Sequence, residues 1–406
     1  PEGARPMSIY DTPIFFFFFL EVEKTKFAAT DMWLQKLSIL NFKNYSEAEL
    51  TLSQTVNILT GKNGAGKTNV LDAIHYLSMC KSYFNPIDSQ QIRQGQDFFM
   101  IQGVFEKSNQ EEVVSCGLKR AQKKQFKRNK KEYQRLADHI GLFPLVIISP
   151  NDVNNITDGS EERRRFIDNV ISQTDRAYLD ELIAYNRSLA NRNALLRQIS
   201  TTGKYDPTLL EIYDQQLVAL GTRIFDARQG FMKVFTELFH QYYQYLAAGE
   251  EQVELIYDSS LLVHDFATLL MQRFDRDRML ERTTVGIHKD DLLFMIQGMP
   301  LKKFGSQGQQ KTFLIALKLA QYAFLVQKNK FQPLLLLDDI FDKLDDNRTK
   351  KLMKMVSNQD FGQICITDTS RIRMKKIFDE IGVEARIFEI EKGEVCTAYS
   401  DLCSEI

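Results

Sequence analysis

The most informative stretch of the chain is GKNGAGKT, which runs from Gly61 to Thr68 and follows the pattern GxxxxGK[ST]. Glycines in this pattern let the backbone turn tightly and expose successive amide groups to a phosphate, which larger side chains would block. We expect Lys67 to reach the terminal phosphates and the Thr68 hydroxyl to bind magnesium. The predicted nucleotide-binding residues are Gly61, Lys62, Asn63, Gly64, Ala65, Gly66, Lys67 and Thr68.

The segments on both sides of this loop support a nucleotide site. Residues 55–60 (TVNILT) are of strand type, and residues 69–80 (NVLDAIHYLSMC) carry apolar side chains at helical spacing. A helix N-terminus behind the loop favours phosphate. A chance glycine-rich turn would not need this strand and helix. Nucleotide binding alone does not define a function, however, because many unrelated proteins have such a loop.

A pair of carboxylates follows a strand of buried type late in the chain. The run LLLLDD, residues 334–339, would deliver Asp338 and Asp339 at the carboxyl end of that strand. We expect Asp338 to hold magnesium, directly or through water, and Asp339 to polarise the attacking water. An acidic strand end would explain the carboxylates but not their occurrence together with a phosphate-binding loop.

A second phosphate-binding helix end is predicted in FGSQGQQKTFLIALKLA, residues 304–320, where a small polar loop opens an amphipathic helix. A helix N-terminus with a serine and an exposed glycine backbone favours anions. One nucleotide needs only one phosphate-binding loop, so we expect Ser306, Gly308 and Gln309 to contact a nucleotide held by another subunit. A dimer would then have two such sites.

These segments imply an α/β fold that is interrupted by helices. Apolar residues at three- and four-residue steps between residues 159 and 246 predict a helical hairpin with a break at residues 201–207. We predict a P-loop ATPase head of mixed sheet and helices with an inserted α-helical lobe. The predicted segments are 1–31, a non-native or disordered extension before Met32; 32–155, the first part of the ATPase lobe; 156–250, the helical lobe; and 251–406, the second part of the ATPase lobe.

Residues 119–135 (KRAQKKQFKRNKKEYQR) form a strongly basic run. The net charge of −1 gives the chain as a whole no attraction for nucleic acid, so DNA binding would need a local patch of this kind. A solvated charged hairpin would give the same sequence, and Arg163, Arg164 and Arg165 compete as DNA contacts. The candidate DNA contacts in the run are Lys123, Lys124, Lys127, Arg128, Lys130 and Lys131.

The composition is that of a globular protein without a membrane segment. The 406 residues are 44% hydrophobic and 26% charged, which suffices for more than one core. The apolar run at residues 14–20 is far shorter than the roughly 20 residues that span a bilayer, and it lacks the basic flank of a signal peptide. The five cysteines are dispersed without a CxxC pair, which fits a reducing compartment. We therefore expect a cytoplasmic protein with no membrane partner.

In their order along the chain, these segments resemble the ATP-binding-cassette heads of the SMC-like group, and more closely the RecF family of recombinational repair proteins. The resemblance spans Met32 to about residue 370 and is carried by LSILNFKNY, NGAGKTNVLDAIHYL, ISPNDVNNITDGSEERRRFID, RNALLRQ, GIHKDD, FGSQGQQK and LLLLDDIFDKLD. It implies a Walker A pair at Lys67 and Thr68 and a Walker B pair at Asp338 and Asp339. It also implies a signature motif acting in trans, formed by Ser306, Gly308 and Gln309.

The resemblance implies further residues and partners. Lys43 would reach a nucleotide phosphate, Asp345 would lie in the D-loop, and Thr367, Asp368 and Thr369 stand where many transport cassettes place a switch histidine. The expected activity is slow, magnesium-dependent ATP hydrolysis in a homodimer that closes on DNA when ATP binds. The expected setting is the repair of bacterial gaps and stalled forks on single-stranded and duplex DNA, where RecO and RecR help to load RecA.

Three alternatives are weighed against this interpretation. The sequence SQGQQ in place of the usual LSGGQ disfavours a transporter subunit, and the stretch between Asn155 and Leu246 is too short for the arm of a longer SMC-like protein. The intact P-loop and acid pair disfavour a binding module that has lost hydrolysis.

His288, within GIHKDD, could contact either the nucleotide or the interface of the lobes.

Overall fold

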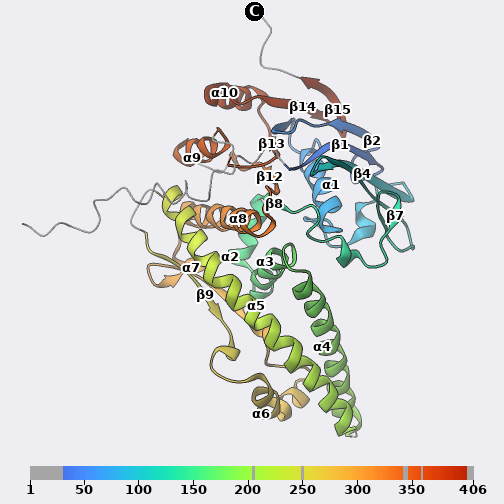
Figure 1. Ribbon diagram of the computed structural model, residues 1–406, viewed down its shortest axis with the longest axis vertical. Coiled ribbons are helices and arrows are strands. Elements are labelled where there is room, and N and C mark those ends of the chain that lie inside the picture. Colours follow the sequence, from blue (N-terminus) through green and yellow to red (C-terminus); the bar gives the residue numbers. More distant parts are fainter. Residues whose placement is uncertain (1–30, 204–205, 248–250, 342–345, 358–359, 400–406) are drawn as a thin grey trace, which may run out of the picture.

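The computed structural model describes residues 31–203, 206–247, 251–341, 346–357 and 360–399. They form two six-stranded sheets with a helix between them, and a helical lobe that extends away from the sheets (Figure 1). Within these ranges no helix is long and apolar enough to cross a membrane.

One sheet carries the P-loop and is mostly parallel. Its strands lie in the order β15 (Glu394–Tyr399), β14 (Ala385–Glu391), β3 (Val56–Thr60), β13 (Ile364–Asp368), β12 (Leu334–Asp338) and β8 (Leu145–Ile148). The pair β14 and β15 is antiparallel, and the other neighbours are parallel. Every residue of β3, β8, β12 and β13 is buried, as expected for parallel strands that are covered on both faces.

The two faces of this sheet pack into different cores. Leu334 and Leu336 of β12 share a core with α1 (Lys67–Met79), whereas Leu335 and Leu337 share one with α8 (Gln307–Asn329). Side chains alternate between the faces of a strand, so a single apolar run serves both helices. The Walker A helix and the signature helix therefore lie on opposite faces of one sheet.

The other sheet is antiparallel and covers the far side of α1. Buried and exposed or half-buried residues alternate along β4, so one face of the strand packs on α1. The strand order is β2 (Glu47–Thr51), β1 (Met32–Leu40), β4 (Phe98–Lys107), β5 (Gln110–Lys119), β6 (Gln125–Arg128) and β7 (Lys131–Glu132).

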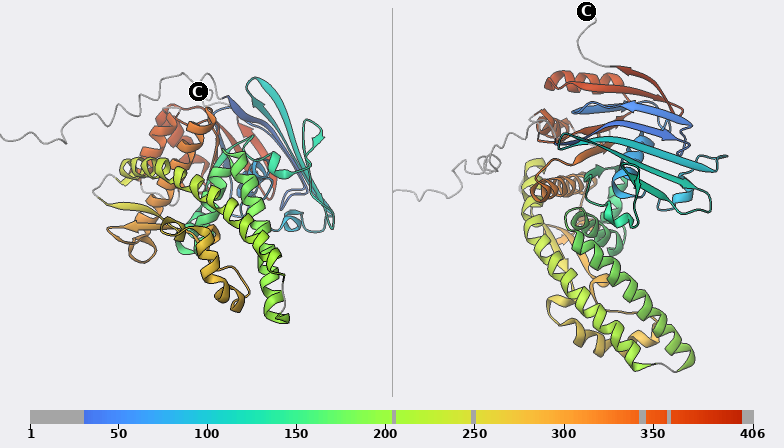
Figure 2. Two further views of the ribbon diagram at one scale, coloured as in Figure 1. Left: turned by 60° about the horizontal axis from the view of Figure 1, so that its bottom comes forward. Right: turned by 45° about the vertical axis from the view of Figure 1, so that its right-hand side comes forward.

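The helical lobe is built on α4 (Arg176–Thr202) and α5 (Pro207–Ala247), which form the predicted hairpin and lie side by side in Figures 1 and 2. The 41 residues of α5 span about 60 Å at 1.5 Å per residue. The buried face of α5 packs along α8, which anchors the hairpin to the sheet. The short α2 (Asn154–Thr157) and α3 (Ser160–Ser172) lead into the hairpin.

The segment after residue 250, which the sequence interpretation assigns to the ATPase lobe, packs on the helical hairpin. The added segment comprises β9 (Val253–Asp258), α6 (Phe266–Met279), β10 (Asp291–Ile296), β11 (Met299–Pro300) and α7 (Leu301–Phe304). Its three strands form a small antiparallel sheet, and α6 packs on α4 and α5 (Figure 1). A Cβ at Gly221 of α5 would lie 2.5 Å from the Phe266 ring, and Asp277 of α6 pairs with Arg192 of α4 at 2.7 Å. We propose a lobe boundary between α7 and α8.

Two further helices complete the ATPase lobe, and 3₁₀ turns occur in both lobes. Helices α9 (Asp346–Ser357) and α10 (Arg371–Ile381) follow β12 and β13 and lie beside the mixed sheet (Figure 1). Single turns of 3₁₀ helix lie at Asp88–Gln91, Leu136–Asp138, Pro150–Val153, Ser260–Leu262 and Ile287–Lys289.

Candidate nucleotide site and nucleic-acid surface

The P-loop connects β3 to α1, and its backbone adopts conformations that favour glycine. The φ angle is 151° at Gly61 and 120° at Gly66. A Cβ at Gly61 would lie 2.2 Å from the carbonyl oxygen of Ile390, and a Cβ at Gly66 would lie 2.6 Å from Nδ2 of Asn44. Glycine is therefore required at both positions by the available space as well as by φ.

Lys67 is the first residue of α1, and its ammonium lies against the loop. Its Nζ donates to the carbonyl oxygens of Gly61 at 2.9 Å and Lys62 at 3.2 Å, and the residue is buried. Lys62, Asn63 and Gly64 are exposed at the outer turn of the loop. The outer turn of the loop is thus exposed to solvent, while the ammonium of Lys67 is held close to the loop carbonyl groups.

The acid pair meets the P-loop at the carboxyl ends of the parallel strands. The Thr68 hydroxyl donates to Oδ1 of Asp338 at 2.8 Å, and the Thr367 hydroxyl donates to the same oxygen at 2.9 Å. Burial raises the pKa of Asp338 above the ordinary carboxyl value, whereas these two hydrogen bonds favour its charged form. The hydrogen bond between Thr68 and Asp338 joins residues that are 270 positions apart in the sequence. It brings together the two side chains that the sequence predicts as magnesium ligands.

Asp339 stands next to this contact in an unusual conformation. Its φ of 46° lies in the left-handed region, and its backbone amide donates to Thr367 Oγ1 at 2.9 Å. Its Oδ1 is buried and has no hydrogen-bond partner among the described residues. A buried carboxylate oxygen without a partner is costly, so it fits a position that awaits a water or a cation. Asp345, the expected D-loop residue, lies outside the described residues.

Asn44 forms hydrogen bonds with the P-loop and the start of α1. The sequence interpretation did not name Asn44 as a site residue. Its Nδ2 donates to the carbonyl oxygen of Ala65 at 2.9 Å, and its Oδ1 accepts from Asn69 Nδ2 at 2.7 Å. The amide of Gly393, in the turn between β14 and β15, donates to the same Ala65 oxygen at 2.8 Å. The only signal in the sequence was its position in NFKNY, beside Lys43.

Lys43 contacts the body of α1. Its Nζ lies 2.5 Å from Oδ2 of the buried Asp72, and it approaches the rings of Phe42 and Phe84 to 5.6 and 5.4 Å. In the described residues the neighbouring Asn44 makes the polar contact with the loop instead. A contact of Lys43 with a nucleotide phosphate stays a prediction.

The signature segment lies at the N-terminus of α8. Ser306 Oγ accepts from the backbone amide of Gln309 at 3.2 Å, and Gln309 Oε1 accepts from the amide of Ser306 at 2.7 Å. These two hydrogen bonds form a capping box at the start of the helix, and Ser306 is exposed. Gln309 also donates to Glu251 at 2.9 Å. Among the described residues, none of the hydrogen bonds of these two side chains reaches the P-loop or the acid pair.

The basic run forms the outer edge of the antiparallel sheet, and the structure changes which of its cations are available. Lys124 is engaged with Asp88 at 2.7 Å and with the Cys80 carbonyl oxygen, and Arg128 pairs with Glu112 at 2.5 Å. Lys124 and Arg128 therefore already have partners within the subunit, and a contact of either with DNA stays a prediction. The other four candidate contacts, Lys123, Lys127, Lys130 and Lys131, are exposed or half-buried.

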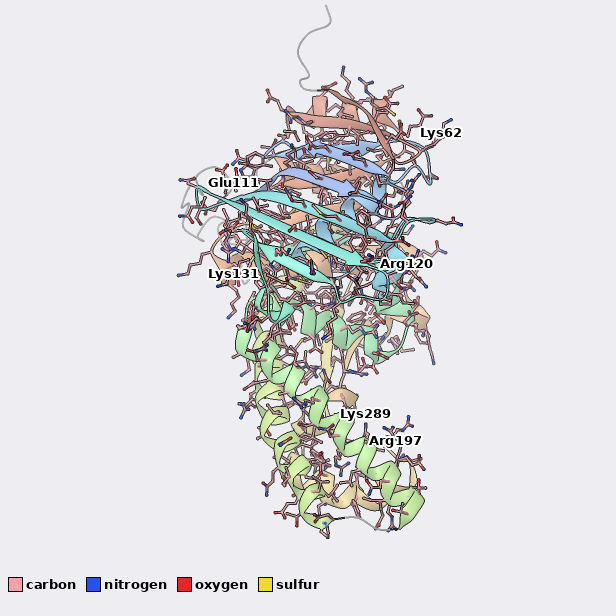
Figure 3. All side chains as sticks on the ribbon, turned by 90° about the vertical axis from the view of Figure 1, so that its right-hand side faces the viewer. Lys62, Glu111, Arg120, Lys131, Arg197 and Lys289 are labelled. Carbon is pink, nitrogen blue, oxygen red and sulfur yellow. The ribbon has the colours of Figure 1, made fainter. Side chains whose placement is uncertain are left out.

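The labelled cations of the ATPase lobe in Figure 3 lie at two different edges of the molecule. Figure 3 shows Lys131 and Glu111 at one edge, and Lys62 and Arg120 at the opposite edge. Two cations of the helical lobe, Lys289 and Arg197, lie on the same side as Lys62 and Arg120 (Figure 3). The basic run is therefore not one continuous patch.

Two of the three arginines that compete as DNA contacts hold the helical lobe together. Arg163 makes a two-pronged contact with Asp291 at 2.7 and 2.9 Å, and Arg164 donates to the backbone carbonyl of Asp290 at 2.6 Å. Arg165 pairs with its helix neighbours Glu161 and Glu162 while remaining exposed. Such surface pairs contribute little to stability, so only Arg165 remains a candidate for an external anion.

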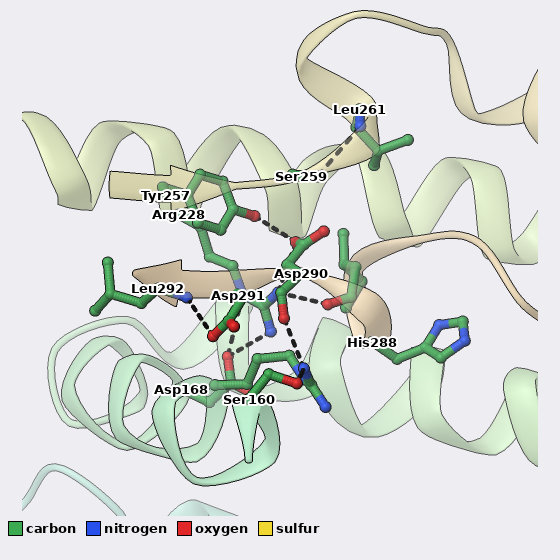
Figure 4. Close-up of polar contacts among 12 residues, drawn as sticks. Ser160, Asp168, Arg228, Tyr257, Ser259, Leu261, His288, Asp290, Asp291 and Leu292 are labelled. Atoms are coloured by element: carbon green, nitrogen blue, oxygen red, sulfur yellow. Dashed lines mark hydrogen bonds and ion pairs between the residues drawn. The ribbon is translucent and has the colours of Figure 1, made fainter. Parts of the chain in front are cut away.

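His288 belongs to the interior of the helical lobe. Its Nδ1 lies 2.8 Å from the Tyr185 hydroxyl, and burial lowers its pKa to about 4. The neighbouring Asp290 accepts from the fully buried Arg228 and from Tyr257, which joins β9 to α5 (Figure 4). The sequence interpretation places His288 at the nucleotide or at the interface of the lobes, whereas its ring nitrogens here contact Tyr185 and the Thr283 carbonyl oxygen inside the helical lobe.

Known proteins resemble this chain over most of its length. The family model RecF/RecN/SMC N terminal domain matches residues 33–389. The DNA replication and repair protein RecF of Flavobacterium johnsoniae is 48% identical over 359 residues, which are 88% of this chain and 100% of that protein. RecF of Phocaeicola vulgatus is 49% identical over 366 residues, with 90% and 98% covered. A solved structure of the recombination mediator protein RecF with ATP, from the RecFOR pathway, matches with a TM-score of 0.83 at 30% identity and covers 92% of this chain and 99% of that one.

Proposed function

The chain belongs to the RecF family of DNA replication and repair proteins, and on this basis we propose that it is an ATPase whose dimer closes on DNA when ATP binds. Hydrolysis reopens the dimer and releases the DNA. When the dimer closes, the residues of the two subunits that contact DNA phosphates form one continuous surface. The affinity for DNA therefore rises with the fraction of protein that is dimeric. ATP then acts as the switch.

One observation supports this mechanism above the others, namely that each subunit carries two separate halves of a nucleotide site. The P-loop, Thr68 and Asp338 form one half, and the exposed N-terminus of α8 at Ser306 forms the other, with no hydrogen bond between the two side-chain sets in the described residues. A free helix N-terminus binds anions. Two subunits related by a twofold axis would complete two sites at once.

The chemistry that we propose follows from the positions of the side chains. Thr68 and Asp338 would hold magnesium, which when bound neutralises charge on the β- and γ-phosphates. Lys67 would hold the terminal phosphates, and the partner's helix N-terminus would cap them. Asp339 would orient the attacking water through its unpartnered Oδ1. The shorter arm of an aspartate, compared with a glutamate, supports slow hydrolysis.

We further propose partners and a setting by family. RecO and RecR would help this protein to load RecA at single-strand gaps and stalled forks in the bacterial cytoplasm. The DNA would be single-stranded or duplex, with gap junctions as the preferred target. Because the chain shows no base-reading motif, binding would recognise the backbone or the shape of a junction.

The proposed DNA contacts predict a specific effect on salt dependence. Glutamine at three cations of the basic run toward its Lys131 edge should weaken ATP-dependent duplex binding and should flatten the plot of log K against log salt by about 0.9 for each phosphate that the variant no longer neutralises. The matched control carries glutamine at three cations on the opposite side, and it should keep the wild-type slope. The test variant changes Lys127, Lys130 and Lys131, and the control variant changes Arg120, Arg197 and Lys289. A flatter slope in the control alone would assign the DNA to the other side.

A further inference from the structure

A polar cluster inside the ATPase lobe connects the Walker A helix to the signature helix, and the nucleotide site described above does not use it. Its members come from α1, from the segment after α1, from the turn after β8, and from α8. They are Asp72, Ser82, Tyr83, Asp152 and Lys318, and all but Tyr83 are buried.

The first half of the cluster is centred on Asp72 of α1, one turn after Thr68. Its carboxylate is fully buried and accepts from Ser82 Oγ at 2.6 Å and from the backbone amide of Tyr83 at 2.7 Å. Lys43 balances its charge at 2.5 Å. The position of the segment after α1 is therefore fixed by the Walker A helix.

The second half is centred on Lys318 of α8. Its Nζ pairs with Asp152 Oδ1 at 2.7 Å and lies 3.4 Å from the Tyr83 hydroxyl. That hydroxyl donates to Asp152. Burial and the adjacent Asp152 raise the pKa of Tyr83 well above its usual range, so the phenol keeps the proton that it donates.

Tyr83 is the link between the two halves. Its backbone amide is held by Asp72 on the Walker A helix, and its hydroxyl is held by Asp152 and Lys318 on the other side. Lys318 lies on the same helix as Ser306, about 18 Å along the axis at 1.5 Å per residue. Because a helix is stiff, a shift at Lys318 would move its N-terminus as well.

We propose that Tyr83, Asp152 and Lys318 are positioning residues that couple the P-loop of one nucleotide site to the signature end of the other. Nucleotide at the P-loop acts on α1, and the cluster passes the displacement to α8, whose N-terminus serves the partner's nucleotide. The two sites of the dimer are then cooperative. This inference rests on the proposed function, because it requires the signature end to act in trans.

The test is Tyr83→Phe, which removes the linking hydroxyl and leaves both the ring and the Lys318–Asp152 pair. ATP affinity of the dilute monomer should stay within about twofold of wild type, because a positioning residue does not touch the nucleotide. At a protein concentration high enough that dimerisation does not limit the rate, the Hill coefficient of hydrolysis against ATP should fall from near the number of sites, about 2, toward unity. A second variant, Lys318→Met combined with Asp152→Asn, should lower the Hill coefficient in the same way. It removes both charges of the ion pair together, so it leaves no buried charge without a partner.

The matched control is Tyr185→Phe, which removes a hydroxyl that bonds His288 inside the helical lobe. Its Hill coefficient should equal that of wild type. Cooperative hydrolysis that is unchanged in Tyr83→Phe, or wild-type hydrolysis that is itself non-cooperative in an ATP-dependent dimer, would overturn the coupling and leave the proposed function standing. A wild-type protein that does not dimerise in ATP would overturn the proposed function and the coupling with it.

Discussion

Replacing Asp339 by asparagine is expected to slow ATP hydrolysis by about 10²- to 10³-fold while ATP-driven dimerisation persists. A positioned general base contributes about this factor, and asparagine keeps the size of the side chain but loses its basicity. Asparagine also tolerates the left-handed φ of 46° at this position, so the fold should be undisturbed. The measurement is phosphate release in a single turnover with ATP bound to all sites.

The neighbouring carboxylate provides the contrast for this experiment. Asp338→Asn should raise the ATP and magnesium concentrations needed for half-maximal activity, because Asp338 accepts from Thr68 and would hold the cation. Asp339→Asn should leave those concentrations nearly unchanged and lower the maximal rate. Hydrolysis by Asp339→Asn at the wild-type rate would mean that another group orients the water.

Replacing Ser306 by glutamate is expected to weaken ATP-driven dimerisation by about a hundredfold or more, with no change in ATP binding by the monomer. Placing a negative charge against the partner's triphosphate costs several kcal/mol, and each 1.4 kcal/mol is a factor of ten. An acidic residue at a helix N-terminus is favourable in itself, so α8 should remain folded. Sedimentation in ATP measures the dimer, and a fluorescent nucleotide at low protein concentration measures binding by the monomer.

Two alanine variants separate the loss of a helix cap from the loss of the interface. Ser306→Ala and Asp265→Ala each remove an N-cap acceptor, of α8 and α6 respectively, at a cost of about 1 kcal/mol in stability. We expect Asp265→Ala to dimerise as wild type does and Ser306→Ala to be impaired. Equal dimerisation by Ser306→Glu and wild type would exclude a contact of Ser306 with nucleotide across a dimer.

The features that the sequence predicted best are those set by local pattern. The glycines of the P-loop, the continuous apolar run that ends at Asp338, and the helical period of α4 and α5 each depend on a few adjacent residues. A buried strand or an amphipathic helix must show its period wherever it packs. The resemblance to the RecF family, carried by these segments, is confirmed by the relatives.

The features that the sequence missed depend on contacts between distant residues. The attachment of α6 to the helical lobe is made by Phe266 over Gly221 and by Asp277 with Arg192, and none of these pairs has a local signature. Lys124 looked like its neighbours in a basic run until the structure placed Asp88 beside it. Charge in a sequence gives the number of cations on a surface but not which of them already have partners.

The most direct test of an ATP-switched clamp is to measure dimerisation and duplex DNA binding together at physiological salt, with ATP, with ADP, and for Lys67→Met in ATP. We predict that wild type in ATP dimerises and binds duplex DNA, and that ADP and Lys67→Met support neither, because both lack a triphosphate held between subunits. DNA binding that is equal in ATP and ADP by a protein that stays monomeric would contradict the clamp.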